Sequence, residues 1–145
     1  MTISLEIIIA AIATLFIVQS IKLTTDKIKS NFNIKNILTS YGGMPSSHTA
    51  IVASLCTIVG YYAGIDSLIF GLCVIFSLII VADAMVLRGY IDRNSASLKK
   101  IMETLPSEEQ KKLMPIITKL KHTFPQVLVG AMLGIVIGYL VQLIF

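Results

Sequence analysis

The stretch from Gly42 to Ala50, GGMPSSHTA, places polar and turn-forming residues directly in front of a long apolar run. Its paired glycines permit backbone angles that other residues avoid. The proline and serines that follow are typical of a turn that leads into a helix. The stretch therefore predicts a helix that begins near His48 and carries a cluster of polar groups in its first turn.

The apolar run behind this stretch is one of several in the chain. The 145 residues favour a single domain, 1–145, and are 55% hydrophobic and only 14% charged, with a mean hydropathy of +0.84. Soluble domains carry about 25% charged residues. A spanning helix needs about 20 mainly apolar residues, and the segments that meet or approach this length are 3–21, 48–65, 67–87 and 127–145. We expect an all-α integral membrane bundle of about four transmembrane helices.

The charges between these spans predict an orientation. Residues 22–47 hold four lysines against one acid, and residues 88–122 hold eight basic residues against four acids. With four spans, both basic loops lie on one side, which the positive-inside rule identifies as the cytoplasm. We therefore expect a plasma membrane protein, of bacterial type, with both termini outward. The lysines could equally contact anionic headgroups.

Short amphipathic or interfacial helices are expected in the loop 88–122. One is predicted from Asn94 to Leu105. A second is predicted to begin at the Pro106-Ser107-Glu108-Glu109 cap and to continue through about Lys121, since acids in the first turn and lysines later suit the helix dipole.

Three glycines recur every four residues in the last span, at Gly130, Gly134 and Gly138. Stripes of small residues let helices approach closely in lipid. The stripe predicts close packing within the chain or, as the alternative, a homodimer.

Chemistry-capable side chains gather at one predicted depth. In the four-span arrangement the cytoplasmic boundary holds Lys22, His48, Asp83, Arg88 and His122. Each has a simpler explanation: a cation can anchor a span end, and Asp83 can pair with Arg88 or Lys22. Burial of an acid inside a span is nevertheless costly. The presence of five ionisable residues at one predicted depth also favours a shared site.

Phosphoryl transfer is the chemistry that suits this set. Free N–H groups and the positive dipole at the helix start attract an anion, and Gly43, Ser46 and Ser47 shape that start. Cations neutralise phosphate oxygens. One histidine can attack phosphorus while the other protonates the leaving oxygen.

Three segments resemble the divergent, small-membrane-protein branch related to type 2 phosphatidic acid phosphatases and vanadium-dependent haloperoxidases. That branch shows S-G-G-M-P-S-S-H, then D-A-x-x-[VI]-R, then H-T-P-x-E-V-x-x-G. Here they read GGMPSSHTA at 42–50, DAMVLR at 83–88 and HTFPQVLVG at 122–130. The resemblance covers nearly the whole chain, with Tyr41, Phe124 and Gln126 as departures. Against the wider superfamily's first motif, K-x6-R-P, Lys22 matches and Lys29 and Ser30 depart.

The resemblance implies a membrane phosphatase that hydrolyses a lipid phosphate or diphosphate without a metal ion or other cofactor. It assigns His122 as the nucleophile that forms a phosphohistidine and His48 as the general acid. Lys22, Ser46, Ser47 and Arg88 would hold the phosphate, with Arg88 replacing the motif arginine where Ile116 stands. The expected partners are the lipid phosphate and membrane lipids, not nucleic acid.

Gln126 stands where the family has the acid that orients the nucleophilic histidine. A glutamine oxygen can accept the N–H hydrogen bond but brings no charge, and loss of such a carboxylate can lower turnover about ten-thousandfold. Asp83 could supply the charge instead. The alternative is a weak or inactive homologue that binds or transports anionic phospholipid or polyprenyl phosphate.

Overall fold

The computed structural model describes residues 3–25, 43–110, 112–113, 116 and 120–145. Within these ranges the chain is all-α, as predicted, and no strand occurs. The positions Lys29, Ser30, Tyr41 and Gly42 lie outside the described residues. The elements in order are α1 (Ile3–Thr25), α3 (Ser47–Ala63), α4 (Leu68–Ala82), the π-helical turn η1 (Asp83–Leu87), α5 (Arg88–Met102), α6 (Ser107–Gln110) and α7 (Phe124–Ile144).

Three helices are long and apolar enough to cross a membrane: Leu5–Lys22, Leu68–Met102 and Phe124–Ile144, among the residues searched. Helix α3, with 17 residues, is at the short end of the spanning range. The protein is therefore an all-α membrane protein.

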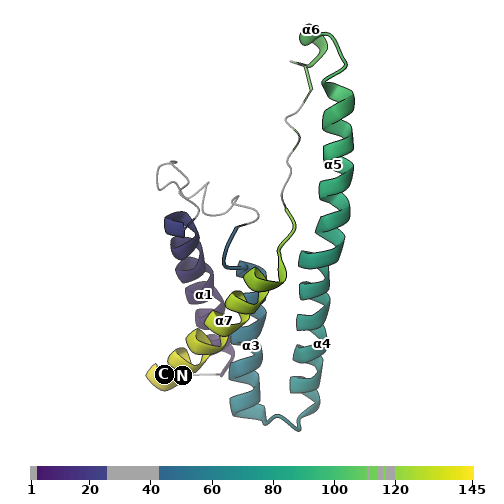
Figure 1. The fold of residues 1–145 in the computed structure, drawn as a ribbon. Coiled ribbons are helices and arrows are strands. Elements are labelled where there is room, and N and C mark those ends of the chain that lie inside the picture. The colour runs from purple at the N-terminus through teal and green to yellow at the C-terminus, as the bar shows by residue number, and fades with distance from the viewer. Residues whose placement is uncertain (1–2, 26–42, 111, 114–115, 117–119) are drawn as a thin grey trace.

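The bundle is built around α3, which packs most extensively against α7 and then against α4 and α1. Figure 1 shows α1, α3 and α7 together, with α4 beside α3. Helices α3 and α7 pack closely because their backbones approach each other at glycine positions. A Cβ at Gly130 would lie 2.5 Å from the Ser46 carbonyl oxygen, and a Cβ at Gly134 would overlap the Ala50 carbonyl. Gly138 approaches Ser54 in the same way. The glycine stripe thus serves packing within the chain, the first of its two predicted uses, and the homodimer stays a prediction.

Helix α4 continues through η1 into α5 without a break, and this long helix extends well beyond the bundle (Figure 1). The prediction of a separate helix from Asn94 to Leu105 is therefore wrong, because these residues belong largely to the continuous helix that ends at Met102. The charges from Arg88 onward do not end the helix, because charged side chains in water are compatible with helical backbone. The predicted second helix is also shorter than expected, since α6 ends at Gln110 and residues 120–123 are not helical.

The acidic residue of α1, Glu6, lies near the opposite end of the helix from Lys22. Glu6 is 3% exposed and accepts a 2.5 Å hydrogen bond from the Tyr62 hydroxyl near the end of α3. This bond offsets the cost of burying the carboxyl group among apolar helices.

Candidate functional site

The start of α3 is held by a serine cap and by α7. The Ser46 hydroxyl oxygen accepts hydrogen bonds from the Thr49 backbone N–H at 3.4 Å and from the Thr49 hydroxyl at 3.0 Å. The Ser46 N–H donates to the Gln126 carbonyl at 3.0 Å. Upstream, Gly43 has a φ of 78°, a left-handed angle that favours glycine, and the Met44–Pro45 bond is cis. These contacts fix the first turn of α3, which begins at Ser47, against the first turn of α7.

The π-helical turn brings Asp83 and Arg88 onto the same face. In an α-helix, side chains five residues apart point about 140° away from each other. In the π-turn the Arg88 N–H instead donates to the Asp83 carbonyl. This hydrogen bond places the two residues one above the other on the same face of the helix. The Arg88 Nε lies 3.1 Å from the Asp83 Oδ2. The predicted ion pair between these residues thus depends on local backbone geometry.

Arg88 also reaches the first turn of α3. Its Nη2 lies 3.3 Å from the His48 Nε2. Because a guanidinium can only donate, this hydrogen bond requires a neutral His48 with its proton on Nδ1. One arginine therefore connects a carboxylate on the long helix with an imidazole on α3.

The segment before α7 is fastened to the long helix by its backbone. The His122 N–H donates to the Ala84 carbonyl within η1 at 3.0 Å. The Asp92 carboxylate accepts from the N–H groups of Leu120 at 2.7 Å and Lys121 at 2.9 Å. These three bonds hold the segment that carries the His122 side chain, which is 1% exposed and lies close enough to Arg88 for the guanidinium charge to act on it.

Burial and neighbouring positive charge determine the ionisation of His122. Burial, followed by the charge of Lys22, lowers the pKa of His122 to about 4, although a hydrogen bond with the Gln126 side chain acts in the opposite direction. His122 is consequently neutral at physiological pH, with an unprotonated ring nitrogen available.

Lys22 comes to the same place from α1. It is 4% exposed and acts electrostatically on both His48 and His122, and the two imidazoles act on each other. The structure therefore brings together the five residues that the sequence predicted at one depth, which are Lys22, His48, Asp83, Arg88 and His122.

Several polar atoms of this cluster are buried without a hydrogen-bond partner. Among the described residues they are the Ser47 hydroxyl oxygen and the Nδ1 atoms of His48 and His122. An unpaired buried polar atom costs about 1–3 kcal/mol, and the first N–H groups of α3 have no carbonyl of their own helix to bind. The cluster is suited to hold an oxyanion. In the part of the chain that the structure describes, no three His, Cys, Asp or Glu side chains gather to hold a metal ion.

Gln126 has a structural partner of its own. Its Oε1 accepts from the Thr123 N–H at 2.8 Å, and the Thr123 hydroxyl accepts from the Gln126 N–H, which completes a capping box at the start of α7. The T-x-x-Q spacing before an apolar run could have revealed this role from the sequence. Local sequence does not reveal the roles of Asp92 and the Ala84 carbonyl, because both act on a segment distant along the chain.

Comparison with known proteins gives one family and one relative. The model of the Divergent PAP2 family matches residues 3–137. The uncharacterized membrane protein YuiD of Bacillus subtilis (strain 168) is 28% identical over 152 residues, which cover 95% of this chain and 94% of the relative. No solved structure shows a significant match.

Proposed function

The chain belongs to the Divergent PAP2 family, and on that premise we propose that it is a membrane phosphatase that hydrolyses a lipid phosphate or diphosphate through a phosphohistidine. The observation that supports this most is the convergence of a buried imidazole, His122, and a half-buried one, His48, with Lys22 and Arg88 around unpaired polar atoms. These groups come from α1, the start of α3, the π-turn and the segment before α7, so only the folded bundle assembles them.

In this proposal His122 is the nucleophile. Its low pKa keeps the ring neutral, so a nitrogen lone pair attacks phosphorus while the bond from phosphorus to the lipid oxygen breaks. Water then attacks the phosphohistidine, which releases inorganic phosphate and restores the imidazole.

His48 is the general acid. A phosphate dianion attracts the Arg88 guanidinium away from the His48 Nε2 and favours a protonated ring, which donates its proton to the leaving lipid oxygen. In the second step the neutral ring accepts a proton from the attacking water. Arg88, Lys22, the Ser47 hydroxyl and the N–H groups at the start of α3 hold the phosphate oxygens.

The proposal also places the site at the cytoplasmic leaflet, with both termini outward. The supporting argument is the positive-inside rule, since residues 22–47 and 88–122 carry the basic excess. A lipid headgroup in that leaflet would lie at the depth of the histidines.

The test is phosphate release in detergent without added metal, from phosphatidic acid and polyprenyl phosphates. We expect release by the native chain and a loss of at least about a hundredfold in His122→Ala and His48→Ala. Lys112→Ala, at an exposed position in the loop, is the matched control and should retain release. Equal release from all four proteins would reject the phosphatase.

A second function, binding of an anionic lipid without turnover, is favoured by the surroundings of His122. Within the described ranges the Asp83 carboxylate pairs with Arg88, and the uncharged Gln126 occupies the family's acid position. Among the described residues, no carboxylate acts on His122. Gln126→Glu separates the two functions, because it retains the capping box and adds the charge. A gain of phosphate release in this variant supports a phosphatase, whereas phosphate binding without release in both forms supports the binder.

A further inference from the structure

A groove runs along α3 below the site. It has a volume of about 470 Å³ and lies between α3, α4 and α7. Its walls are two stripes at helical spacing, one on α3 and one on α4, with Ala131 and Ile135 added by α7. The α3 stripe includes Thr49, Cys56 and Gly60, and the α4 stripe includes Phe70, Ser77 and Leu78.

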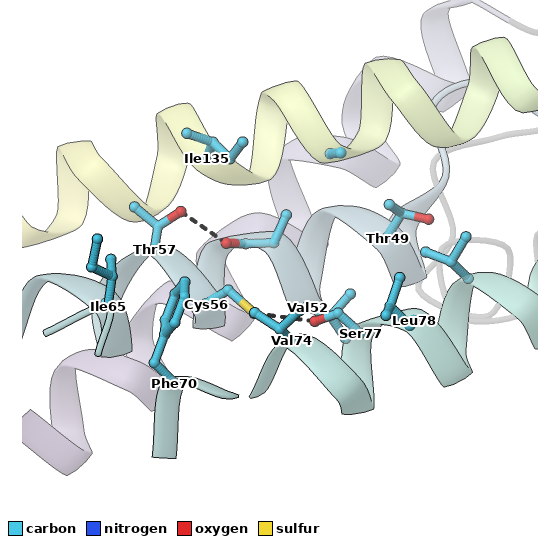
Figure 2. Close-up of a pocket in the computed structure, with 14 residues that line it drawn as sticks. Thr49, Val52, Cys56, Thr57, Ile65, Phe70, Val74, Ser77, Leu78 and Ile135 are labelled. Atoms are coloured by element: carbon cyan, nitrogen blue, oxygen red, sulfur yellow. Dashed lines mark hydrogen bonds between the residues drawn. The ribbon is translucent and has the colours of Figure 1, made fainter. Parts of the chain in front are cut away.

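The polar atoms along these walls are satisfied by the protein. The Cys56 Sγ and Ser77 Oγ lie 3.1 Å apart, and the Ser77 hydroxyl donates to the Cys73 carbonyl. The Thr57 hydroxyl donates to the Ala53 carbonyl at 2.9 Å, and Figure 2 shows the Thr57 and Cys56–Ser77 contacts. The groove therefore offers a hydrocarbon surface and requires no polar partner from an occupant.

The two ends of the groove differ. At one end Thr49, whose hydroxyl donates to Ser46, follows His48 directly in the chain. At the other end the Phe70 ring packs on Gly60, where an added Cβ would lie 2.9 Å from it, and Ile65 lies beside it (Figure 2). Gly60 is about 16 Å along the axis from Thr49, roughly half of the hydrocarbon thickness of about 30 Å.

We propose that this groove seats one hydrocarbon chain of the phosphate-bearing lipid, with Phe70 as its floor. The inference rests on the proposed anion site. A lipid chain is the expected occupant because the groove begins at Thr49, directly after His48 of that site. A lipid whose phosphate binds at the first turn of α3 would direct a chain along the α3 stripe. Helix α4 has no buried residue, so the chain would enter sideways from the bilayer.

The test uses a tryptophan as a reporter, because the chain contains none. Leu78→Trp places it on the groove wall, and Ile79→Trp is the matched control on the same helix, with exposures of 64% and 61% in the native residues. Ile135→Trp and Val136→Trp, at 52% and 54%, form a second pair on α7 in case the first does not fold. Each is placed in vesicles of unlabelled phosphatidylcholine with a small, equal fraction of brominated phosphatidic acid or brominated phosphatidylcholine.

We expect brominated phosphatidic acid to quench Leu78→Trp and Ile135→Trp at least about twice as strongly as brominated phosphatidylcholine. The controls should be quenched equally by both lipids, and Arg88→Ala should remove the difference at the groove positions. Equal quenching by both lipids at the groove positions overturns the inference. So does the same preference at Ile79→Trp and Val136→Trp, because that result means attraction of anionic lipid to the whole surface.

Each tryptophan variant also carries His122→Ala for this reading, so the brominated phosphatidic acid is not hydrolysed while quenching is measured, and phosphate release is measured separately on the native chain. Selective quenching without phosphate release keeps the groove and rejects the phosphatase, whereas phosphate release without selective quenching rejects the groove alone.

Discussion

Helices α7 and α4 flank the same helix, α3, but they meet it in different ways. Helix α7 lays its glycine stripe directly on the α3 backbone and buries Gly130, Gly134 and Gly138. Helix α4 contributes no buried residue and contacts α3 through longer side chains, which leave the groove between them. A Cβ added at Gly71 of α4 would meet no atom of a neighbouring element within 4 Å.

The contrast separates two requirements of the site. The α3–α7 contact fixes backbone positions, since Ser46 at the start of α3 bonds to the Gln126 carbonyl in α7. The α4 side supplies Asp83 and Arg88 through the π-turn, while its apolar part has no buried residue. Rigid positioning is thus a property of the α3–α7 contact, and the open groove is a property of the looser α3–α4 contact.

The largest expected effect breaks the rigid side. Gly134→Leu puts a side chain where the Ala50 carbonyl already lies, so we expect a destabilisation of about 3 kcal/mol or more and loss of the folded bundle. Gly71→Leu, the matched change on α4, should leave stability within about 0.5 kcal/mol. Thermal unfolding in detergent measures both, and equal melting temperatures would contradict the contrast.

The next change tests the chemical contribution of the α4 side. Arg88→Ala removes the partner of both Asp83 and His48, and we expect phosphate release to fall about a hundredfold. Arg93→Ala is the control, because Arg93 stacks over the Tyr90 ring at 4.5 Å, and it should stay within about twofold. A similar loss in both variants would mean that general positive charge, not the π-turn geometry, matters.

A smaller effect is expected where the α4–α5 helix positions the segment before α7. Asp92→Ala removes the acceptor for the Leu120 and Lys121 N–H groups, so His122 is less well placed. We expect kcat to fall about tenfold with little change in KM, and Asp92→Asn to recover part of it. A change confined to KM or to stability would show that Asp92 does not position the nucleophile.

The smallest effect concerns pH. The folded protein keeps His122 neutral because its pKa is lowered from 6.5 to about 4, so this contribution to stability is present above pH 6.5 and is lost as the pH falls toward 4. Lowering the pH from 7 to 5.5 should cost about 1 kcal/mol. Melting temperatures of the native chain and His122→Gln at both pH values measure it, and an equal pH dependence in the two would oppose the assignment.

The sequence predicted those parts of the fold that local pattern determines. The apolar runs placed α1, α3 and α7 within a few residues, and the turn chemistry before His48 predicted a helix start that Ser46 caps. The gathering of Lys22, His48, Arg88 and His122 followed from the order of the spans, because alternate helix ends meet on one side of a membrane.

The parts that failed depend on contacts between distant segments. A separate helix was predicted from Asn94, yet one helix continues from α4 through η1 to Met102. The π-turn depends partly on the His122 N–H that bonds the Ala84 carbonyl, a contact that local sequence does not encode. The second loop helix was predicted from its cap and charges, but residues 120–123 are held instead by Asp92 and Ala84.

The most direct measurement of the central claim is to trap the covalent intermediate. The purified chain is mixed with ³²P-labelled lipid phosphate, quenched in base and examined for label on the protein. The account predicts acid-labile, base-stable label on the native chain and none on His122→Ala. Label that persists in His122→Ala, or phosphate release from a native chain that never carries label, would contradict it.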